Sequence, residues 1–143
     1  MNIWVNGCFD ILHMGHINLF WFAKHYQIKN IDCLDNIDEN ILYVGVDSDE
    51  RVKFLKGNKR PINNLHDRVM MLSSLKMIDS VVIFNNEDEL RYFIKELDID
   101  YIIIGSHYEN KIIIGSEYAK KGVVYYPVDN RSTTNLIKKI KNL

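Results

Sequence analysis

Two histidines, His13 and His16, stand three residues apart with one glycine between them, shortly after the turn-forming segment 7–10. A short apolar run, 3–5, precedes this segment, and an apolar-periodic stretch, 17–23, follows it, which predicts a strand, a tight loop and a helix start. A helix start presents unpaired backbone N–H groups and a partial positive charge, and both favour phosphate. Imidazoles there can donate hydrogen bonds to charge that develops on a phosphoryl group. The residues therefore predict a phosphate site at the first strand–helix junction.

Three other interpretations of this segment are open on the residues alone. A His-x-x-His pair can supply half of a zinc site, but the other cysteine and histidine residues are scattered along the chain. The histidines could also cap the helix without taking part in chemistry. Cys8 could act as a nucleophile, although we favour a small residue packed in the turn. The sequence favours the phosphate site over all three.

The composition limits the class of protein. A length of 143 residues with 47% hydrophobic residues predicts a single domain, 1–143, with a substantial core. A net charge of −1 argues against a general nucleic-acid binder. Two distant cysteines exclude a disulfide framework and favour a reducing compartment. The sequence has no signal peptide and no apolar run of about 20 residues, so we expect a cytoplasmic protein with neither a membrane nor a nucleic acid as partner.

Apolar runs alternate with helical periodicity along the chain. Strands are predicted at 2–6, 41–46, 80–84, 101–104 and 123–126. Helices are predicted at 15–26, 65–76, from 87 onward, at 116–121 and from 132–134 onward, the last with Leu136, Ile137 and Ile140 facing inward. The polar segment 27–40 is expected to be a surface connection. This alternation predicts an α/β fold with a Rossmann-like five-stranded parallel sheet, order 3-2-1-4-5, and helices on both faces.

The predicted sheet order places the ligand site at the carboxyl ends of the central strands, where the order reverses. Five basic residues lie within the ten positions 51–60, which we expect to form a loop that binds a triphosphate; an ordinary solvated loop, or a nucleic-acid contact, is the alternative. Arg68 falls in the first turn of its predicted helix, where a cation opposes the helix dipole. That position indicates another partner for Arg68.

The segment Gly-x-Phe-Asp followed by His-x-Gly-His resembles the hallmark of the cytidylyltransferase-like nucleotidyltransferases. The resemblance implies that the two histidines stabilise the transition state while an acceptor phosphate attacks the α-phosphorus of a nucleoside triphosphate. Pyrophosphate leaves, and no covalent enzyme intermediate forms. It further implies Mg²⁺ held mainly by the triphosphate and by water, with no dedicated metal ligands in the chain. The protein could also form a homodimer.

The middle of the chain resembles one branch of this family. Residues 52–57 with Arg60-Pro61 resemble bacterial D-glycero-β-D-manno-heptose 1-phosphate adenylyltransferases, which implies ATP and a sugar 1-phosphate as substrates. Ser-Thr-Thr at 132–134 is a signature shared with glycerol-3-phosphate cytidylyltransferases, which leaves CTP and glycerol 3-phosphate as the alternative. Gly-Ser-His-Tyr at 105–108 departs from the Gly-Gly-Asp-Tyr of the heptose enzymes. Arg131 replaces a small or apolar residue of many relatives.

On this basis the expected site residues fall into three groups. The catalytic group is His13, His16 and Lys56; the nucleotide-binding group is Gly7, Cys8, Phe9, Asp10, Gly15, Arg68, Gly105, Ser132, Thr133 and Thr134; the acceptor-binding group is Asp47, Lys53, His107 and Tyr108. Two other classes of function remain as alternatives, a nucleotide-binding regulator without turnover and a nucleic-acid-binding module.

Overall fold

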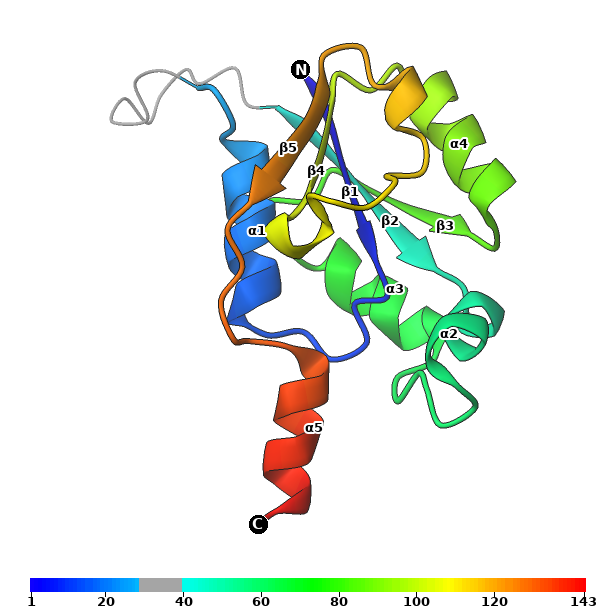
Figure 1. Ribbon diagram of the computed structural model, residues 1–143, viewed down its shortest axis with the longest axis vertical. Coiled ribbons are helices and arrows are strands. Elements are labelled where there is room, and N and C mark those ends of the chain that lie inside the picture. Colours follow the sequence, from blue (N-terminus) through cyan, green and yellow to red (C-terminus); the bar gives the residue numbers. More distant parts are fainter. Residues whose placement is uncertain (29–39) are drawn as a thin grey trace.

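Five apolar strands form one parallel sheet in a computed structural model that describes residues 1–28 and 40–143. The strands are β1 (Asn2–Gly7), β2 (Ile41–Asp47), β3 (Ser80–Phe84), β4 (Tyr101–Gly105) and β5 (Gly122–Tyr126). Their order is β3-β2-β1-β4-β5 (Figure 1), and every neighbouring pair is parallel. The predicted fold class and strand order are confirmed. Most of the predicted connection at 27–40 lies outside the described residues.

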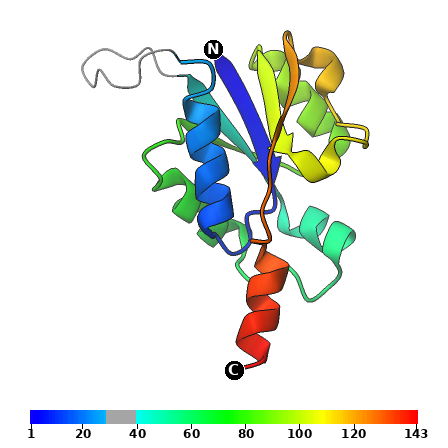
Figure 2. The same ribbon diagram turned by 60° about the vertical axis from the view of Figure 1, so that its left-hand side comes forward.

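Helices cover both faces of this sheet, as predicted (Figures 1 and 2). The helices are α1 (Met14–Lys24), α2 (Asp49–Lys56), α3 (Leu65–Ser73), α4 (Glu87–Glu96) and α5 (Thr133–Lys141). Successive β1 side chains point to opposite faces. Ile3 therefore joins a buried cluster with Phe20 of α1 and Leu72 of α3, whereas Trp4 joins one with Ile94 of α4. Burial on both faces explains the near-continuous apolar runs of the strands.

The prediction of a basic loop at 51–60 is wrong for its first half, because residues 49–56 form helix α2. Ser48 caps this helix by accepting a hydrogen bond from the Arg51 N–H group. Asp49 lies in the first turn and Lys56 in the last, as the helix dipole prefers. Periodicity could not indicate the helix, because Val52 is its only buried residue.

Two further expectations about helices are corrected. The helix predicted at 116–121 is a single 3₁₀ turn, η2 (Ser116–Tyr118), and a similar turn, η1 (Ser106–Tyr108), follows β4. Helix α5 leaves the body of the molecule beyond the carboxyl ends of the strands (Figures 1 and 2), and its Ile140 is 56% exposed rather than facing inward. The beginning of α5 is nevertheless fixed, since the Thr133 hydroxyl donates a hydrogen bond to the Ile11 carbonyl, 3.0 Å away.

Candidate active site

A cavity of about 280 Å³ opens at the carboxyl ends of β1, β4 and β5. Its walls come from the loop after β1, the start of α1, the end of α2, turn η1 and the segment between β5 and α5. It gathers most of the predicted site residues: Gly7, Cys8, Phe9, Asp10, His13, Gly15, His16, Lys56, Gly105, His107, Tyr108, Ser132, Thr133 and Thr134. Three predicted site residues, Asp47, Lys53 and Arg68, do not line it.

The two histidines form the cap of α1 and also face the cavity. His13 is the N-cap residue, and its Nδ1 accepts a hydrogen bond from the Gly15 N–H group, 3.1 Å away. His16 Nδ1 in turn accepts from the His13 N–H group at 3.4 Å, and the two rings stack with centroids 3.8 Å apart. A Cβ atom at position 15 would lie 2.9 Å from the His13 ring, so this arrangement requires glycine. The two histidines can therefore cap helix α1 and still face a ligand in the cavity.

The hydrogen bonds at Nδ1 set the tautomer of both rings. A ring nitrogen that accepts from a backbone N–H carries no proton, so the proton of each neutral ring lies on Nε2. Burial, with smaller contributions from the neighbouring His13 and Lys56, lowers the pKa of His16 to about 3. Burial also lowers the pKa of His13; Asp129 opposes this shift, and Arg131 adds to it. Both histidines are thus neutral hydrogen-bond donors near pH 7.

Three cations line the same cavity: Lys56 in the last turn of α2, Arg60 in the loop that follows, and Arg131 just before α5. Lys56 was predicted as a site residue, whereas Arg60 and Arg131 were not. Arg60 was included only as one of the five basic residues at 51–60, the segment expected to bind a triphosphate, and Arg131 was noted only as a departure from relatives. The fold brings the three cations together, because the end of α2, the loop after it and the segment between β5 and α5 all line the cavity.

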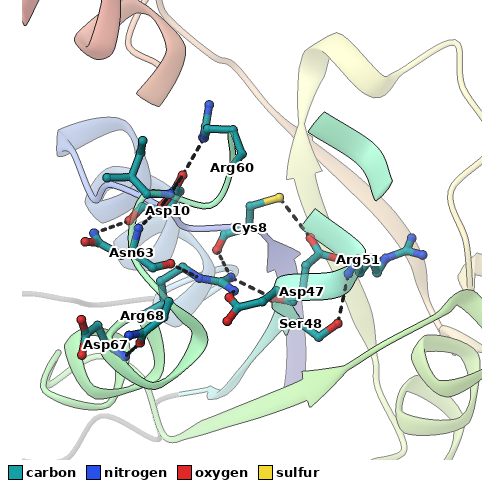
Figure 3. A network of polar contacts seen from close by, with 12 residues as sticks. Cys8, Asp10, Asp47, Ser48, Arg51, Arg60, Asn63, Asp67 and Arg68 are labelled. Carbon is teal, nitrogen blue, oxygen red and sulfur yellow. Dashed lines mark hydrogen bonds and ion pairs between the residues drawn. The ribbon is translucent and has the colours of Figure 1, made fainter. Parts of the chain in front are cut away.

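Arg68, which was predicted to bind the nucleotide, does not line the cavity, and its side chain contacts other parts of the protein. Its side chain is fully buried, and its Nη1 donates to the carbonyls of Cys8 and Asp47 at 2.7 and 2.8 Å (Figure 3). Nη2 donates to the Asp49 carboxylate at 2.8 Å, and Nε donates to the Asn63 carbonyl. The unfavourable place of Arg68 in the first turn of α3 is explained by these contacts, which join α3 to the ends of β1 and β2.

The predicted acceptor residues Asp47 and Lys53 also lie outside the cavity. The Asp47 carboxylate is buried and accepts hydrogen bonds from Arg51 Nε at 2.8 Å and from the Cys8 thiol at 3.4 Å (Figure 3). Lys53 is exposed on α2. Burial and the neighbouring Asp47 raise the pKa of the Cys8 thiol to about 11. Cys8 is therefore protonated near pH 7, which disfavours its action as a nucleophile.

Turn η1 lines another part of the cavity, through His107 and Tyr108. His107 packs on Gly105, where a Cβ atom would lie 2.7 Å from the imidazole ring. Burial lowers the pKa of His107, and Lys111 lowers it further. Burial raises the pKa of Tyr108, and Cys8 and Asp47 add to the shift. The turn thus presents a neutral imidazole and a neutral phenol to the cavity, both able to form hydrogen bonds with a base or a hydroxyl group.

The Ser-Thr-Thr segment begins helix α5 at the edge of the cavity. Ser132 caps the helix by accepting from the Asn135 N–H group at 3.0 Å, and Thr133 is buried against the loop that carries the histidines. The amide groups of the first turn lie near the cavity, a favourable position for an anion. Sequence reasoning missed several other residues of this wall and of α1: Asn18, Tyr126, Pro127, Val128 and Asp129.

Among residues 1–28 and 40–143, no cluster of three or more His, Cys, Asp or Glu side chains could hold a metal ion. The zinc alternative for His13 and His16 therefore finds no further ligands in this part of the chain. In the same described ranges, no helix has the length and apolar character needed to cross a membrane.

Comparison with known proteins defines the class of this fold and site. The sequence profile of the cytidylyltransferase-like family matches residues 4–139, and the chain belongs to that family. It is a nucleotidyltransferase. A solved structure with 24% sequence identity, a lipopolysaccharide core biosynthesis protein from Thermoplasma volcanium, superimposes with a TM-score of 0.60 over 92% of this chain and 98% of that one, which supports the fold.

Among curated relatives, the chain is similar to proteins named bifunctional protein HldE. It is 41% identical over 139 residues to the Campylobacter fetus protein and 40% identical over 139 residues to the Helicobacter hepaticus protein. These matches cover 97% of this chain but only 28% and 26% of the two relatives. The chain thus spans little more than a quarter of the length of these relatives.

Proposed function

We propose that this protein transfers a nucleoside monophosphate from a nucleoside triphosphate to a phosphorylated small molecule and releases pyrophosphate. The observation that carries the proposal is the pair of neutral imidazoles, whose Nδ1 atoms are occupied by backbone N–H groups. This leaves two Nε2–H donors beside a cavity that also holds Lys56, Arg60 and Arg131. Such a site suits the charge that develops on a phosphoryl group during in-line displacement.

In the proposed reaction, an oxygen of the acceptor phosphate attacks the α-phosphorus of the triphosphate. The bond from that phosphorus to the bridging oxygen breaks, and pyrophosphate leaves with the electron pair. A phosphate monoester is already ionised near pH 7, so the step needs no general base. His13 and His16 donate hydrogen bonds to the oxygens on the α-phosphorus, while Lys56 and Arg131 neutralise the charge of the phosphate chain. Catalysis then consists of positioning and charge stabilisation.

We propose Mg²⁺ as the cofactor, bound mainly by phosphate oxygens and water. The carboxylates that line the cavity are already paired, Asp10 with Arg60 and Asp129 with Arg131. The described residues therefore fit an ion that the triphosphate brings with it better than an ion in a protein cage. Bound in this way, Mg²⁺ supplies additional neutralisation of the phosphate charge.

We further propose ATP and a heptose 1-phosphate as the substrates, giving an ADP-sugar. The 38–41% identity to the HldE relatives and the Lys-Gly-x-x-Arg-Pro pattern support this choice. His107 counts against it, because an imidazole replaces the carboxylate of the heptose enzymes at a cavity-lining position. A panel of ATP and CTP against heptose 1-phosphate and glycerol 3-phosphate, scored by pyrophosphate release, tests the substrate. Turnover with CTP and glycerol 3-phosphate alone would refute the heptose assignment and retain the reaction class.

The reaction class is tested by replacing each histidine. His13→Ala and His16→Ala should each lower kcat roughly 10²–10³-fold, the typical effect of losing one transition-state donor. The same substitution at His66, an exposed residue of α3 that does not line the cavity, is the matched control and should retain turnover. Near-native kcat in either cavity variant would refute that histidine's catalytic role. Nucleotide binding without pyrophosphate release in the unmodified protein would favour a regulator.

A further inference from the structure

A single carboxylate, that of Asp10, joins the loop after β1 to the loop between α2 and α3. Its side chain is completely buried and accepts hydrogen bonds from the backbone N–H groups of Ile62 and Asn63, each at 2.9 Å (Figure 3). The Asn63 side chain returns a hydrogen bond to the Asp10 carbonyl at 2.7 Å. Burial opposes ionisation of Asp10, but these N–H donors and Arg60 outweigh it and hold its pKa below the ordinary value. The Asp10 side chain is thus an anion whose hydrogen bonds join the loop after β1 to the loop between α2 and α3.

The remaining partner of Asp10 is Arg60, and this contact uses only part of the guanidinium. Arg60 Nε donates to Asp10 Oδ2 at 2.6 Å, and the Arg60 side chain is only 13% exposed. Arg60 Nη2 is buried and has no hydrogen-bond partner among the described residues. Within residues 1–28 and 40–143, no other buried side-chain nitrogen or oxygen lacks a hydrogen-bond partner. A buried donor that lacks an acceptor is costly, and more so when it is charged.

The position of Arg60 indicates what the missing acceptor is. Arg60 lines the same cavity as His13, His16 and Lys56. A guanidinium presents donors in a planar fork that matches two oxygens of a phosphate, and one edge of this fork is already oriented by Asp10. Fixing the side chain before a ligand arrives reduces the conformational entropy that binding must remove. The pairing is therefore typical of an oriented anion-binding arginine, in contrast with Arg68, whose three nitrogens all have protein acceptors.

We infer that Arg60 binds phosphate oxygens of a substrate through its Nη groups, and that Asp10 is the positioning residue that holds it. This inference rests on the proposed function for the identity of the substrate, but the binding step stands apart from turnover. The phosphate can belong to the triphosphate or to the acceptor. In either case Arg60 contacts the ligand, whereas the Asp10 carboxylate acts only through Arg60 and through the loop at 62–63.

Binding measured without turnover separates the two sources of phosphate. Isothermal titration with MgATP and with inorganic pyrophosphate reports on the triphosphate subsite, and titration with inorganic phosphate and with glycerol 3-phosphate reports on the acceptor subsite. Arg60→Gln should weaken binding of one of these pairs roughly 10- to 100-fold, as expected for the loss of a charged hydrogen bond. Arg60→Lys, which keeps the charge but loses the fork, should restore only part of the affinity.

Asn63→Ala is the matched control, because it removes one hydrogen bond from the same junction but no cation from the cavity. It should lower the melting temperature and leave every titration unchanged. Asp10→Asn removes the partner of Arg60, so it should weaken the same ligand pair as Arg60→Gln and raise the corresponding KM more than it lowers kcat. If Arg60→Gln lowered stability like Asn63→Ala but changed no affinity, Arg60 would be structural and the inference would be refuted. Absence of turnover in the unmodified protein, with the affinity change intact, would refute only the proposed reaction.

Discussion

Replacing His16 with glutamine tests whether the imidazole is held neutral by the fold. The pKa of His16 is about 3 in the folded protein, against an ordinary value of 6.5. Below pH 6.5 the unfolded chain therefore binds a proton at this residue that the folded chain does not bind. The free energy of unfolding then falls by about 1.4 kcal/mol for each pH unit. Between about pH 7.5 and about pH 5 the wild-type protein should lose about 2 kcal/mol through His16 alone.

His16→Gln removes this titration while keeping a group that can accept from the His13 N–H. Urea unfolding at a series of pH values, followed by circular dichroism, measures the free energy of unfolding of both proteins. The difference between wild type and variant should change by about 2 kcal/mol over that range, with the variant less sensitive to acid. His66→Gln, at an exposed position, controls for the loss of an imidazole elsewhere. Parallel curves for wild type and His16→Gln would show that burial does not depress this pKa.

Three further substitutions test other parts of the structure. Arg68→Ala should lower the free energy of unfolding by roughly 3–5 kcal/mol in urea titration, because it leaves the Asp49 carboxylate and three backbone carbonyls without this donor; an unchanged midpoint would contradict this. Cys8→Ser should retain kcat, and Cys8 should react slowly with a thiol reagent at pH 8 because of its raised pKa. Thr133→Val should lose about 1 kcal/mol of stability and raise the nucleotide KM in steady-state assays, since α5 loses its bond to Ile11.

The sequence alone was sufficient to predict the parallel sheet and the position of the histidine pair at the start of a helix. Apolar runs covered on both faces are recognisable without a structure, and their alternation with helices constrains the strand order. The histidine pair was recognisable because its residues are local: the cap, the glycine and both rings lie within residues 13–16. In such cases the sequence spacing already fixes which atoms can meet.

Contacts between distant segments could not be predicted in the same way. The place of Arg68 indicated another partner, but the Cys8 and Asp47 carbonyls lie 60 and 21 residues away, and only the folded sheet brings them to the guanidinium. Arg60 is similar, since its orientation depends on Asp10, 50 residues earlier. Helix α2 was not predicted for a different reason. Only one of its eight side chains is buried, so its sequence has no periodic pattern of apolar residues.

Residues 1 and 143 lie at different distances from the cavity, and this difference decides where a tag or a tether is best attached. Residue 1 lies at the amino ends of the strands, whereas α5 begins at the cavity wall and extends beyond the carboxyl ends (Figures 1 and 2). An affinity tag, a fluorophore or a surface tether joined to residue 1 is separated from the ligand site by the length of the sheet. The same attachment at residue 143 acts on a helix whose first turn, Thr133 and Thr134, forms part of that site. Immobilisation through residue 1 therefore places the attachment farther from the ligand site than immobilisation through residue 143.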